Sequence, residues 1–204
     1  PDYTGPGGDQ DVTGITADSR RVEPGFVFSA MQGVVADGRQ YIPSAVKAGA
    51  IAVLGEDLPA VEGAAGIEVA NARFALAEAS ARFYPVQPNE IVAITGTNGK
   101  SSTVDFLRQI WSACGHRAVS FGTAGVEGAE TLPIAHTTPD PLTLHALLAD
   151  VAARGVTHAA MEASSHGLEQ RRLDGVRLAA GGFSNLQRDH LDYHGSMEAY
   201  AEAK

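Results

Sequence analysis

The sequence has a single cysteine, Cys114, and no long run of apolar residues. One cysteine excludes an internal disulfide and is typical of a reducing compartment, so we expect a cytoplasmic protein. The absence of a long apolar run and of a signal peptide argues against a membrane partner. Basic residues are also scarce, because 15 Lys and Arg stand against 24 Asp and Glu, for a net charge of −9. This balance argues against nucleic acid or an anionic membrane surface as the main partner.

What the chain does have is an ordinary globular composition, with 44% hydrophobic and 19% charged residues. Its 204 residues are enough for one large domain or two small ones, each with a buried core. The chain begins at Pro1 rather than at methionine and stops at Lys204 inside a helical pattern. We therefore expect it to be a fragment of a longer protein.

Two prolines divide the chain into two predicted domains. Residues 12–56 show the pattern strand, turn, strand, helix, strand, and residues 71–84 form a second predicted helix. Pro85 and Pro88 then bracket a short linker, where a helix cannot continue. The expected domains are residues 1–88 and residues 89–204.

Strands and helices alternate regularly after the linker. Strands are predicted at residues 91–95, 118–121, 157–161 and 178–183. Helices are predicted at residues 101–114 and 141–154 and from residue 196 onward. This alternation predicts an α/β fold, with a mostly parallel sheet and helices on both faces. Ligands bind such sheets beyond the carboxyl ends of the strands, where the polar clusters of this chain also lie.

The most informative motif follows the first of these strands and reads Gly96-Thr97-Asn98-Gly99-Lys100-Ser101-Ser102. Its glycines let successive N–H groups point inward at phosphate, and the next helix adds its positive N-terminal end. Lys100 would supply charge for the outer phosphates of ATP, and the Ser101 hydroxyl is placed to bind Mg²⁺. A full Walker pattern has glycine where this chain has Ile94, so an ordinary strand-to-helix turn is the alternative interpretation. Apolar residues at helical spacing favour the nucleotide site, namely Val104, Leu107, Ile110, Trp111 and Cys114.

A second polar cluster, which includes Glu162, Ser164 and His166, follows the strand at residues 157–161. An acidic residue at a strand end downstream of a phosphate loop is typical of a carboxylate that serves nucleotide-bound Mg²⁺. A helix-capping turn is the alternative. Three side chains that follow within one or two turns suit a carboxylate or phosphate substrate, with a solvated helix face as the alternative, and these are Gln170, Arg171 and Arg172.

A third cluster follows the strand at residues 178–183 and contains two aspartates and two histidines. Its spacing does not match a tetrahedral zinc site. His190 could bind a hard divalent ion together with carboxylates, whereas we interpret His194 as structural.

Upstream, helix capping explains Asp140 and Pro141, and the preceding Thr137 and Thr138 could donate hydrogen bonds to a ligand carboxylate.

Taken together, these segments resemble the Mur ligase family, and within it the MurE type. The resemblance covers nearly the whole chain after residue 12, although the phosphate loop alone indicates only the wider superfamily. The more specific segments are Thr16-Ala17-Asp18-Ser19-Arg20, Gly33 with Asp37-Gly38-Arg39, Thr137-Thr138-Pro139-Asp140, Met161-Glu162-Ala163-Ser164-Ser165-His166-Gly167-Leu168 and Asn185-Leu186-Gln187-Arg188-Asp189-His190-Leu191-Asp192-Tyr193-His194-Gly195. The family has three domains, and this chain is similar to the UDP-binding domain plus part of the central ATPase domain.

The resemblance implies ATP-dependent amide bond formation in peptidoglycan assembly. ATP phosphorylates the D-glutamate of UDP-MurNAc-L-Ala-D-Glu, and the amine of meso-diaminopimelate, in preference to L-lysine, attacks the acyl phosphate. By similarity, Lys100 and the loop amides hold the ATP phosphates, and Ser101 and Glu162 serve one Mg²⁺. A second Mg²⁺ would be served by His190 and by Lys204, which is carbamoylated in the family; the sequence alone indicates an exposed lysine. The residues that match substrate-binding positions are Thr137, Thr138, Ser164, Gln170 and Arg172 for the muramoyl dipeptide and Ser19 for the uridine.

The chain also departs from the family pattern. His136 stands where asparagine is common, and Val34 and Val35 replace more polar residues near the uridine pocket. Since the domain that selects the amino acid is absent, we expect this fragment alone to lack ligase activity. We also expect a monomer.

Two alternatives stay open at this point. One is a folylpolyglutamate synthase-like ligase, against which the segment at residues 16–39 argues. The other is a non-catalytic module that binds UDP-sugar peptides, against which the intact Lys100, Ser101, Glu162 and His190 argue.

Overall fold

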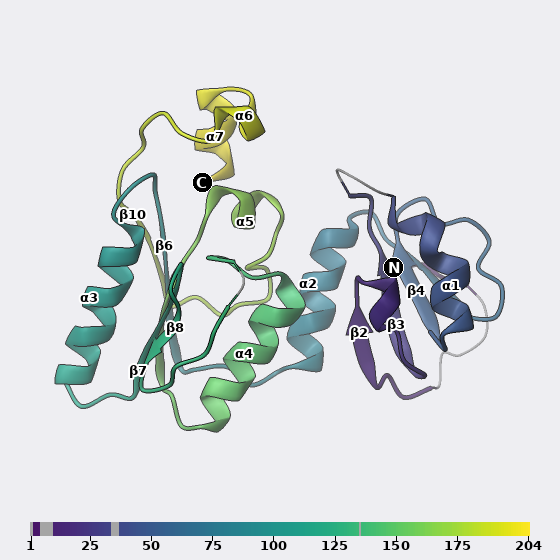
Figure 1. The fold of residues 1–204 in the computed structure, drawn as a ribbon, viewed down its shortest axis with the longest axis horizontal. Helices are drawn as coiled ribbons and strands as arrows, with labels where there is room; N and C mark the ends of the chain where they lie inside the picture. Colours follow the sequence, from purple (N-terminus) through teal and green to yellow (C-terminus); the bar gives the residue numbers. More distant parts are fainter. Residues whose placement is uncertain (1, 5–9, 34–36, 135) are drawn as a thin grey trace. The chain divides into compact units, whose positions relative to one another are not determined.

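The chain forms two compact units, Pro1–Phe83 and Tyr84–Lys204, in the computed structural model (Figure 1). The structure describes residues 2–4, 10–33, 37–134 and 136–204, so Val34 and Val35 lie outside the described residues. No helix in these described ranges is long and apolar enough to cross a membrane. Each unit has its own sheet.

The first unit contains a five-stranded sheet with helices on both faces (Figure 1). In spatial order its strands are β1 (Asp2–Thr4), β5 (Ala65–Glu68), β4 (Ala52–Gly55), β3 (Phe26–Ala30) and β2 (Gly14–Thr16). Strands β2 to β5 run parallel, and β1 pairs antiparallel with β5. The helices are the 3₁₀ turns η1 (Ser19–Arg21) and η2 (Gly38–Tyr41) and the α-helices α1 (Ile42–Lys47) and α2 (Ala72–Phe83).

In the first unit, side chains that point alternately to the two faces of the sheet build the core. In β3, Phe28 and Ala30 belong to the same buried cluster as Ile42 and Ala45 of α1. Ser29 of β3 is buried on the opposite face, because successive strand residues point to opposite sides of a sheet. Both faces of this small sheet are therefore covered.

The second unit contains a five-stranded sheet that is parallel except at one edge. In spatial order its strands are β10 (Ala180–Phe183), β6 (Glu90–Thr95), β9 (His158–Glu162), β7 (Ala118–Gly122) and β8 (Gly125–Gly128). Only β8 runs antiparallel, in a hairpin with β7. The helices are α3 (Lys100–Ala113), α4 (Pro141–Ala153), α5 (Ser165–Glu169), α6 (Leu191–His194) and α7 (Met197–Ala203).

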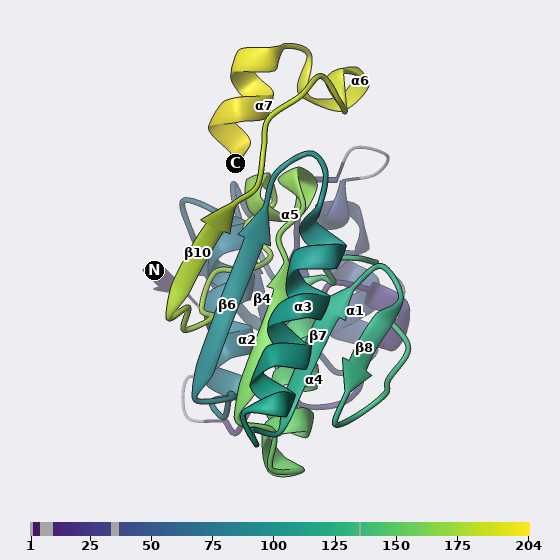
Figure 2. The ribbon, with the colours of Figure 1, turned by 90° about the vertical axis from the view of Figure 1, so that its left-hand side faces the viewer.

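Helices α3 and α4 cover opposite faces of this sheet (Figures 1 and 2). Ala159 and Met161 of β9 belong to the cluster that contains Leu148 of α4. Ala160, between them, packs instead with Val104 of α3. The α/β fold with a mostly parallel sheet and helices on both faces, predicted from the sequence, is confirmed.

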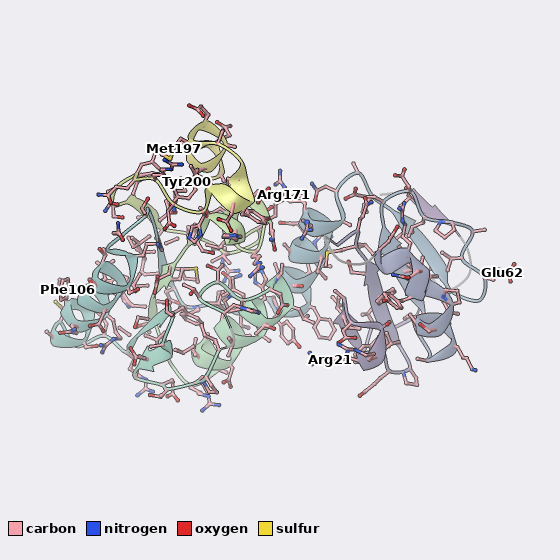
Figure 3. All side chains as sticks on the ribbon, turned by 45° about the horizontal axis from the view of Figure 1, so that its top comes forward. Arg21, Glu62, Phe106, Arg171, Met197 and Tyr200 are labelled. Carbon is pink, nitrogen blue, oxygen red and sulfur yellow. The ribbon has the colours of Figure 1, made fainter. Side chains whose placement is uncertain are left out.

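Several local expectations need correction. The short strands β5 and β8 and the short helices α5 and α6 were not predicted, since they offer few residues from which to read a period. Helix α3 also buries fewer apolar side chains than the helical spacing predicted. Ile110 is 58% exposed, and Cys114, which directly follows the helix, is exposed as well. Phe106 is 61% exposed on the same helix (Figure 3).

Candidate nucleotide and metal site

The candidate residues of the second unit follow the carboxyl ends of its parallel strands. The phosphate loop comes after β6, the segment that contains Ser164 comes after β9, and the segment that contains His190 comes after β10. Helices α6 and α7 lie beyond these strand ends (Figure 2). Open parallel sheets bind ligands at this edge.

The phosphate loop curls as its glycines suggest. Gly96 and Gly99 have φ angles of +132° and +83°, which side-chain-bearing residues rarely adopt. A Cβ atom on Gly96 would also overlap the Ser184 hydroxyl. Two of the loop amides are already engaged, since Thr97 N–H donates to the Asn185 carbonyl at 2.8 Å and Asn98 N–H to its side chain at 3.1 Å. The amides that remain for phosphate are those of the first turn of α3, which lack intrahelical partners.

Two lysines meet at one carbonyl oxygen of this loop. Lys100 Nζ donates to the carbonyls of Gly96 and Thr97, both at 2.9 Å, and Lys204 Nζ donates to Gly96 O at 2.7 Å. Burial, with a further contribution from the Lys100 charge, lowers the pKa of Lys204 to about 8. Lys204 is therefore a partly buried member of the site, although the sequence by itself indicated an exposed lysine.

The predicted magnesium residues Ser101 and Glu162 are in direct contact. Ser101 Oγ donates to Glu162 Oε1 at 2.9 Å, and the N–H of Thr123 donates to the same oxygen at 3.1 Å. Glu162 is only 3% exposed, at the end of β9. The sequence reasoning missed Thr123, because its contact with Glu162 depends on β7 lying beside β9 in the sheet.

The predicted substrate residues of the second unit form one hydrogen-bonded group. Thr138 is buried, and its hydroxyl donates to the Glu162 carbonyl at 3.0 Å and accepts the Ser164 N–H at 3.1 Å. Arg172 donates to the Thr138 carbonyl at 2.7 Å and to Gln170 Oε1 at 2.7 Å. The Thr137 hydroxyl lies 3.2 Å from that of Thr123, and Ser164 caps α5. His136, which directly precedes Thr137, is exposed.

An aromatic cluster connects His190 with the loop. The His190 ring lies 6.2 Å from the Tyr200 ring, and the Tyr200 hydroxyl is 3.0 Å from Thr97 Oγ1. Tyr200 is 1% exposed in α7 (Figure 3), and Lys204 Nζ lies 4.9 Å from its ring centre. His194 bonds Ser165 Oγ at 3.0 Å, as a structural histidine would. Tyr200 was not anticipated from the sequence.

In the first unit, Ser19 lies in a tightly bonded turn. Asp18 caps η1 by accepting the Arg20 N–H at 3.0 Å, and it also binds the Arg20 guanidinium at 2.8 Å. These bonds lower the pKa of Asp18 to about 2. Asp37 and Arg39 repeat the arrangement at η2.

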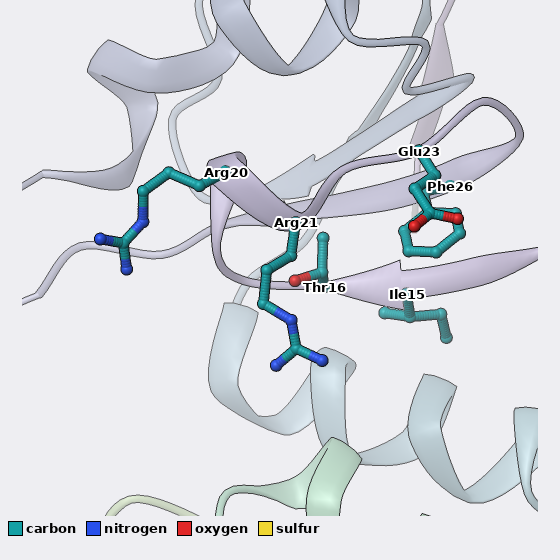
Figure 4. A pocket seen from close by; sticks show the side chains of 6 residues that line it. All are labelled: Ile15, Thr16, Arg20, Arg21, Glu23 and Phe26. Carbon is teal, nitrogen blue, oxygen red and sulfur yellow. The ribbon is translucent and has the colours of Figure 1, made fainter.

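A pocket of about 330 Å³ lies beside η1 (Figure 4). It is lined by Ile15, Thr16, Arg20, Arg21, Glu23 and Phe26. The lining combines an aromatic ring, a hydroxyl and two guanidinium groups, which could receive a flat base and an anionic group. Ser19 itself is not one of these lining residues.

The residues present fit ATP and Mg²⁺. Magnesium prefers oxygen ligands and usually needs only one or two from the protein, because phosphates and water supply the others. Ser101 and Glu162 offer such oxygens beside the loop. Among the described residues there is no group of three or more His, Cys, Asp or Glu side chains that could hold a metal without further ligands.

Both units match known families along nearly their full length. Residues 11–92 match the model described as "Mur ligase family, catalytic domain", and residues 94–204 match "Mur ligase middle domain". Proteins from Brucella melitensis (51% identical) and Agrobacterium fabrum (54% identical) are similar over 98% and 95% of this chain. Both are named UDP-N-acetylmuramoyl-L-alanyl-D-glutamate--2,6-diaminopimelate ligase.

A solved structure of a ligase with the same name is similar as well. It superposes with a TM-score of 0.82 at 38% identity over 94% of this chain. This chain spans about two fifths of the length of these relatives, 42% and 40% for the two sequences and 40% for the structure.

Proposed function

Since this chain belongs to the Mur ligase family, we propose that the whole protein is an ATP-dependent amide ligase of peptidoglycan synthesis. It adds meso-diaminopimelate, in preference to L-lysine, to UDP-MurNAc-L-Ala-D-Glu. Relatives that are 51% and 54% identical across both units carry that name. The observation that carries the proposal is the contact between Ser101 of the phosphate loop and the buried Glu162.

In the proposed reaction, the D-glutamate γ-carboxylate attacks the terminal phosphorus of ATP, which forms an acyl phosphate and releases ADP. The amine of the incoming amino acid then attacks the acyl carbon, an amide bond forms and phosphate leaves. Because two anions must meet in the first step, positioning and charge neutralisation do most of the work. Lys100 would exchange the carbonyls of Gly96 and Thr97 for phosphate oxygens, beside the amides that begin α3.

Ser101 and Glu162 would hold one Mg²⁺, and His190 and Lys204 would serve a second. Bound Mg²⁺ supplies charge that neutralises the phosphates as they react. We further propose that Lys204 is carbamoylated: its neutral amine adds to CO₂, one proton is released, and a cation becomes an anionic ligand. The position of Lys204 Nζ on the Gly96 carbonyl, within the loop, supports this assignment.

Thr137, Thr138, Ser164, Gln170 and Arg172 are assigned to the muramoyl dipeptide. Ser19, which directly precedes the pocket residue Arg20 in the chain, is assigned to the uridine. We propose that the protein acts as a monomer in the cytoplasm without nucleic acid or membrane partners. We also propose that residues 1–88 form a domain that binds the UDP precursor and that residues 89–204 belong to the ATP-binding domain.

Calorimetric titration of this chain with UDP-MurNAc-L-Ala-D-Glu tests the proposal. UDP-MurNAc-L-Ala and a folate serve as control ligands, and ADP with Mg²⁺ tests the nucleotide site separately. Selective binding of the dipeptide precursor is the expected result. Binding of the folate instead would favour a folylpolyglutamate synthase-like ligase, and a whole protein that binds the precursor without turnover would favour a non-catalytic module.

A further inference from the structure

The Glu162 carboxylate is held asymmetrically. Its Oε1 atom receives both hydrogen bonds, from Ser101 Oγ at 2.9 Å and from Thr123 N–H at 3.1 Å. Oε2 has no hydrogen bond to any described residue. If it were also fully buried, it would be a buried polar atom without a partner, but among the described residues only Ser29 Oγ is such an atom. Oε2 is therefore not fully buried, and it is the oxygen that can receive a ligand.

Gly122 is the residue that leaves room for this orientation. It ends β7 with an ordinary φ angle, so its backbone conformation does not require glycine. A Cβ atom on Gly122, however, would come within 3.0 Å of Glu162 Oε1, closer than real Cβ atoms approach other atoms. Any side chain at this position must push the carboxylate away from Thr123 N–H and Ser101.

The same turn continues toward the substrate residues. The hydroxyl of Thr123 lies 3.2 Å from that of Thr137, and the neighbouring Thr138 donates to the Glu162 carbonyl at 3.0 Å. The turn after β7 is thus bonded on one side to Glu162 and on the other to the segment assigned to the muramoyl dipeptide.

We propose that Gly122 and Thr123 form a positioning element that orients the Glu162 carboxylate toward nucleotide-bound Mg²⁺. Gly122 provides the space and Thr123 N–H fixes Oε1, so that Oε2 faces the site. This inference rests on the proposed function, because it assumes that Glu162 serves Mg²⁺.

The Gly122→Ala substitution tests the inference, with Gly181→Ala as the matched control. Gly181 also lies in a strand of this sheet with an ordinary φ angle, but its Cβ would meet nothing within 4 Å. We expect G122A to fold, because the atom it displaces is the end of a flexible side chain. ADP affinity is measured by calorimetry once in excess EDTA and once in excess Mg²⁺. The affinity in Mg²⁺ divided by the affinity in EDTA is the Mg²⁺ enhancement.

In EDTA, both variants should bind ADP as the wild type does. In Mg²⁺, G122A should lose the enhancement by about tenfold or more, the usual effect of removing a partner that orients a metal ligand. G181A should keep the enhancement.

A double variant separates positioning from a general structural effect. Glu162→Ala removes the carboxylate and leaves space beside residue 122, so G122A should cause no further loss in the E162A background. Full additivity of the two effects, or a normal enhancement in G122A, would overturn the inference while leaving the proposed function intact. A wild type whose ADP affinity is independent of Mg²⁺ would overturn both.

Discussion

The side chain of Asn185 is bonded to both polar backbone groups of Asn98. Asn98 N–H donates to Asn185 Oδ1 at 3.1 Å, and Asn185 Nδ2 donates to the Asn98 carbonyl at 2.9 Å. The carboxamide thereby fixes one peptide group on each side of a phosphate-loop residue that lies 87 positions away in the sequence. The loop is held by the segment after β10 as well as by its own glycines.

Asn185→Ala should weaken nucleotide binding. The substitution removes the partner of the Asn98 N–H and one of the two donors to its carbonyl, which keeps the Ser184 hydroxyl at 2.7 Å, so part of the loop must be ordered when ADP binds rather than beforehand. We expect the Kd for ADP to rise about tenfold, since the loss of one or two hydrogen bonds is worth about 1.4 kcal/mol. Calorimetry in EDTA measures this loss without any metal effect.

The control for N185A is Asn71→Ala in the first unit. Asn71 Oδ1 accepts the Phe74 N–H at 2.8 Å at the start of α2, so N71A should lower the melting temperature without changing ADP affinity. Equal ADP affinity in N185A and the wild type would show that the loop is ordered without Asn185.

Lys100→Ala should abolish ligation in the whole protein and spare precursor binding. Lys100 supplies the charge proposed to neutralise the phosphates during transfer, so activity should fall by at least about a hundredfold. Lys47→Ala, which removes an exposed charge from α1, is the control for net charge. Steady-state ligase assays and precursor titrations are the measurements. Persistent ligation in K100A would contradict the assigned role of this residue.

The second unit should lose stability as the pH falls below about 6.5, the usual pKa of histidine. Burial lowers the pKa of His158, with a smaller effect of His116, whose ring lies 4.0 Å away, while Glu90 opposes the shift. The unfolded chain then binds a proton more readily than the folded one. The contribution of neutral His158 to the stability of the folded unit is therefore complete above the pKa that His158 has in the unfolded chain. It declines as the pH falls toward the lower pKa of His158 in the folded chain.

Denaturant unfolding of the wild type and of His158→Asn between pH 8 and pH 5 checks this expectation, over about the range in which histidine titrates. The stability of H158N should decline less steeply over that range. His166, whose pKa is also lowered by burial and by His190 and His194, should keep part of the slope in this variant. Parallel curves for the two proteins would rule out a contribution from His158.

Ser29→Ala should stabilise the first unit. Ser29 Oγ is buried in β3 without a hydrogen-bond partner among the described residues, and such an atom loses its bonds to water on folding. Its removal should raise the free energy of unfolding by about 1 kcal/mol. Ser80→Ala is the matched control, because Ser80 Oγ is buried but donates to the Leu76 carbonyl at 2.7 Å. A clear loss of stability in S29A alone would contradict the expectation.

Features that depend on local sequence could be predicted well. The cap of α4 is one case, because Asp140 accepts the Thr143 N–H and Pro141 begins the helix as expected. The positions of Lys100 at the start of α3 and of Glu162 at the end of β9 are another. Both follow from the alternation of strand and helix and need no knowledge of which strands are neighbours.

Features that depend on the order of strands could not be predicted. Asn185 reaches Asn98 only because β10 lies beside β6, and Thr123 reaches Glu162 only because β7 lies beside β9. Nothing in the local pattern fixes that order. The exposure of Ile110 has a similar origin, since helical spacing identifies an apolar face but not how much of it the sheet covers.

The single tryptophan, Trp111, gives this chain an optical property that follows from its position. It lies in α3 of the second unit, 5.2 Å from the His158 ring, and the first unit contains no tryptophan. Intrinsic tryptophan fluorescence will therefore follow the unfolding of the second unit alone, whereas circular dichroism will follow both. If the two units unfold independently, the two transitions will not coincide, and their separation will measure the difference in stability between the units.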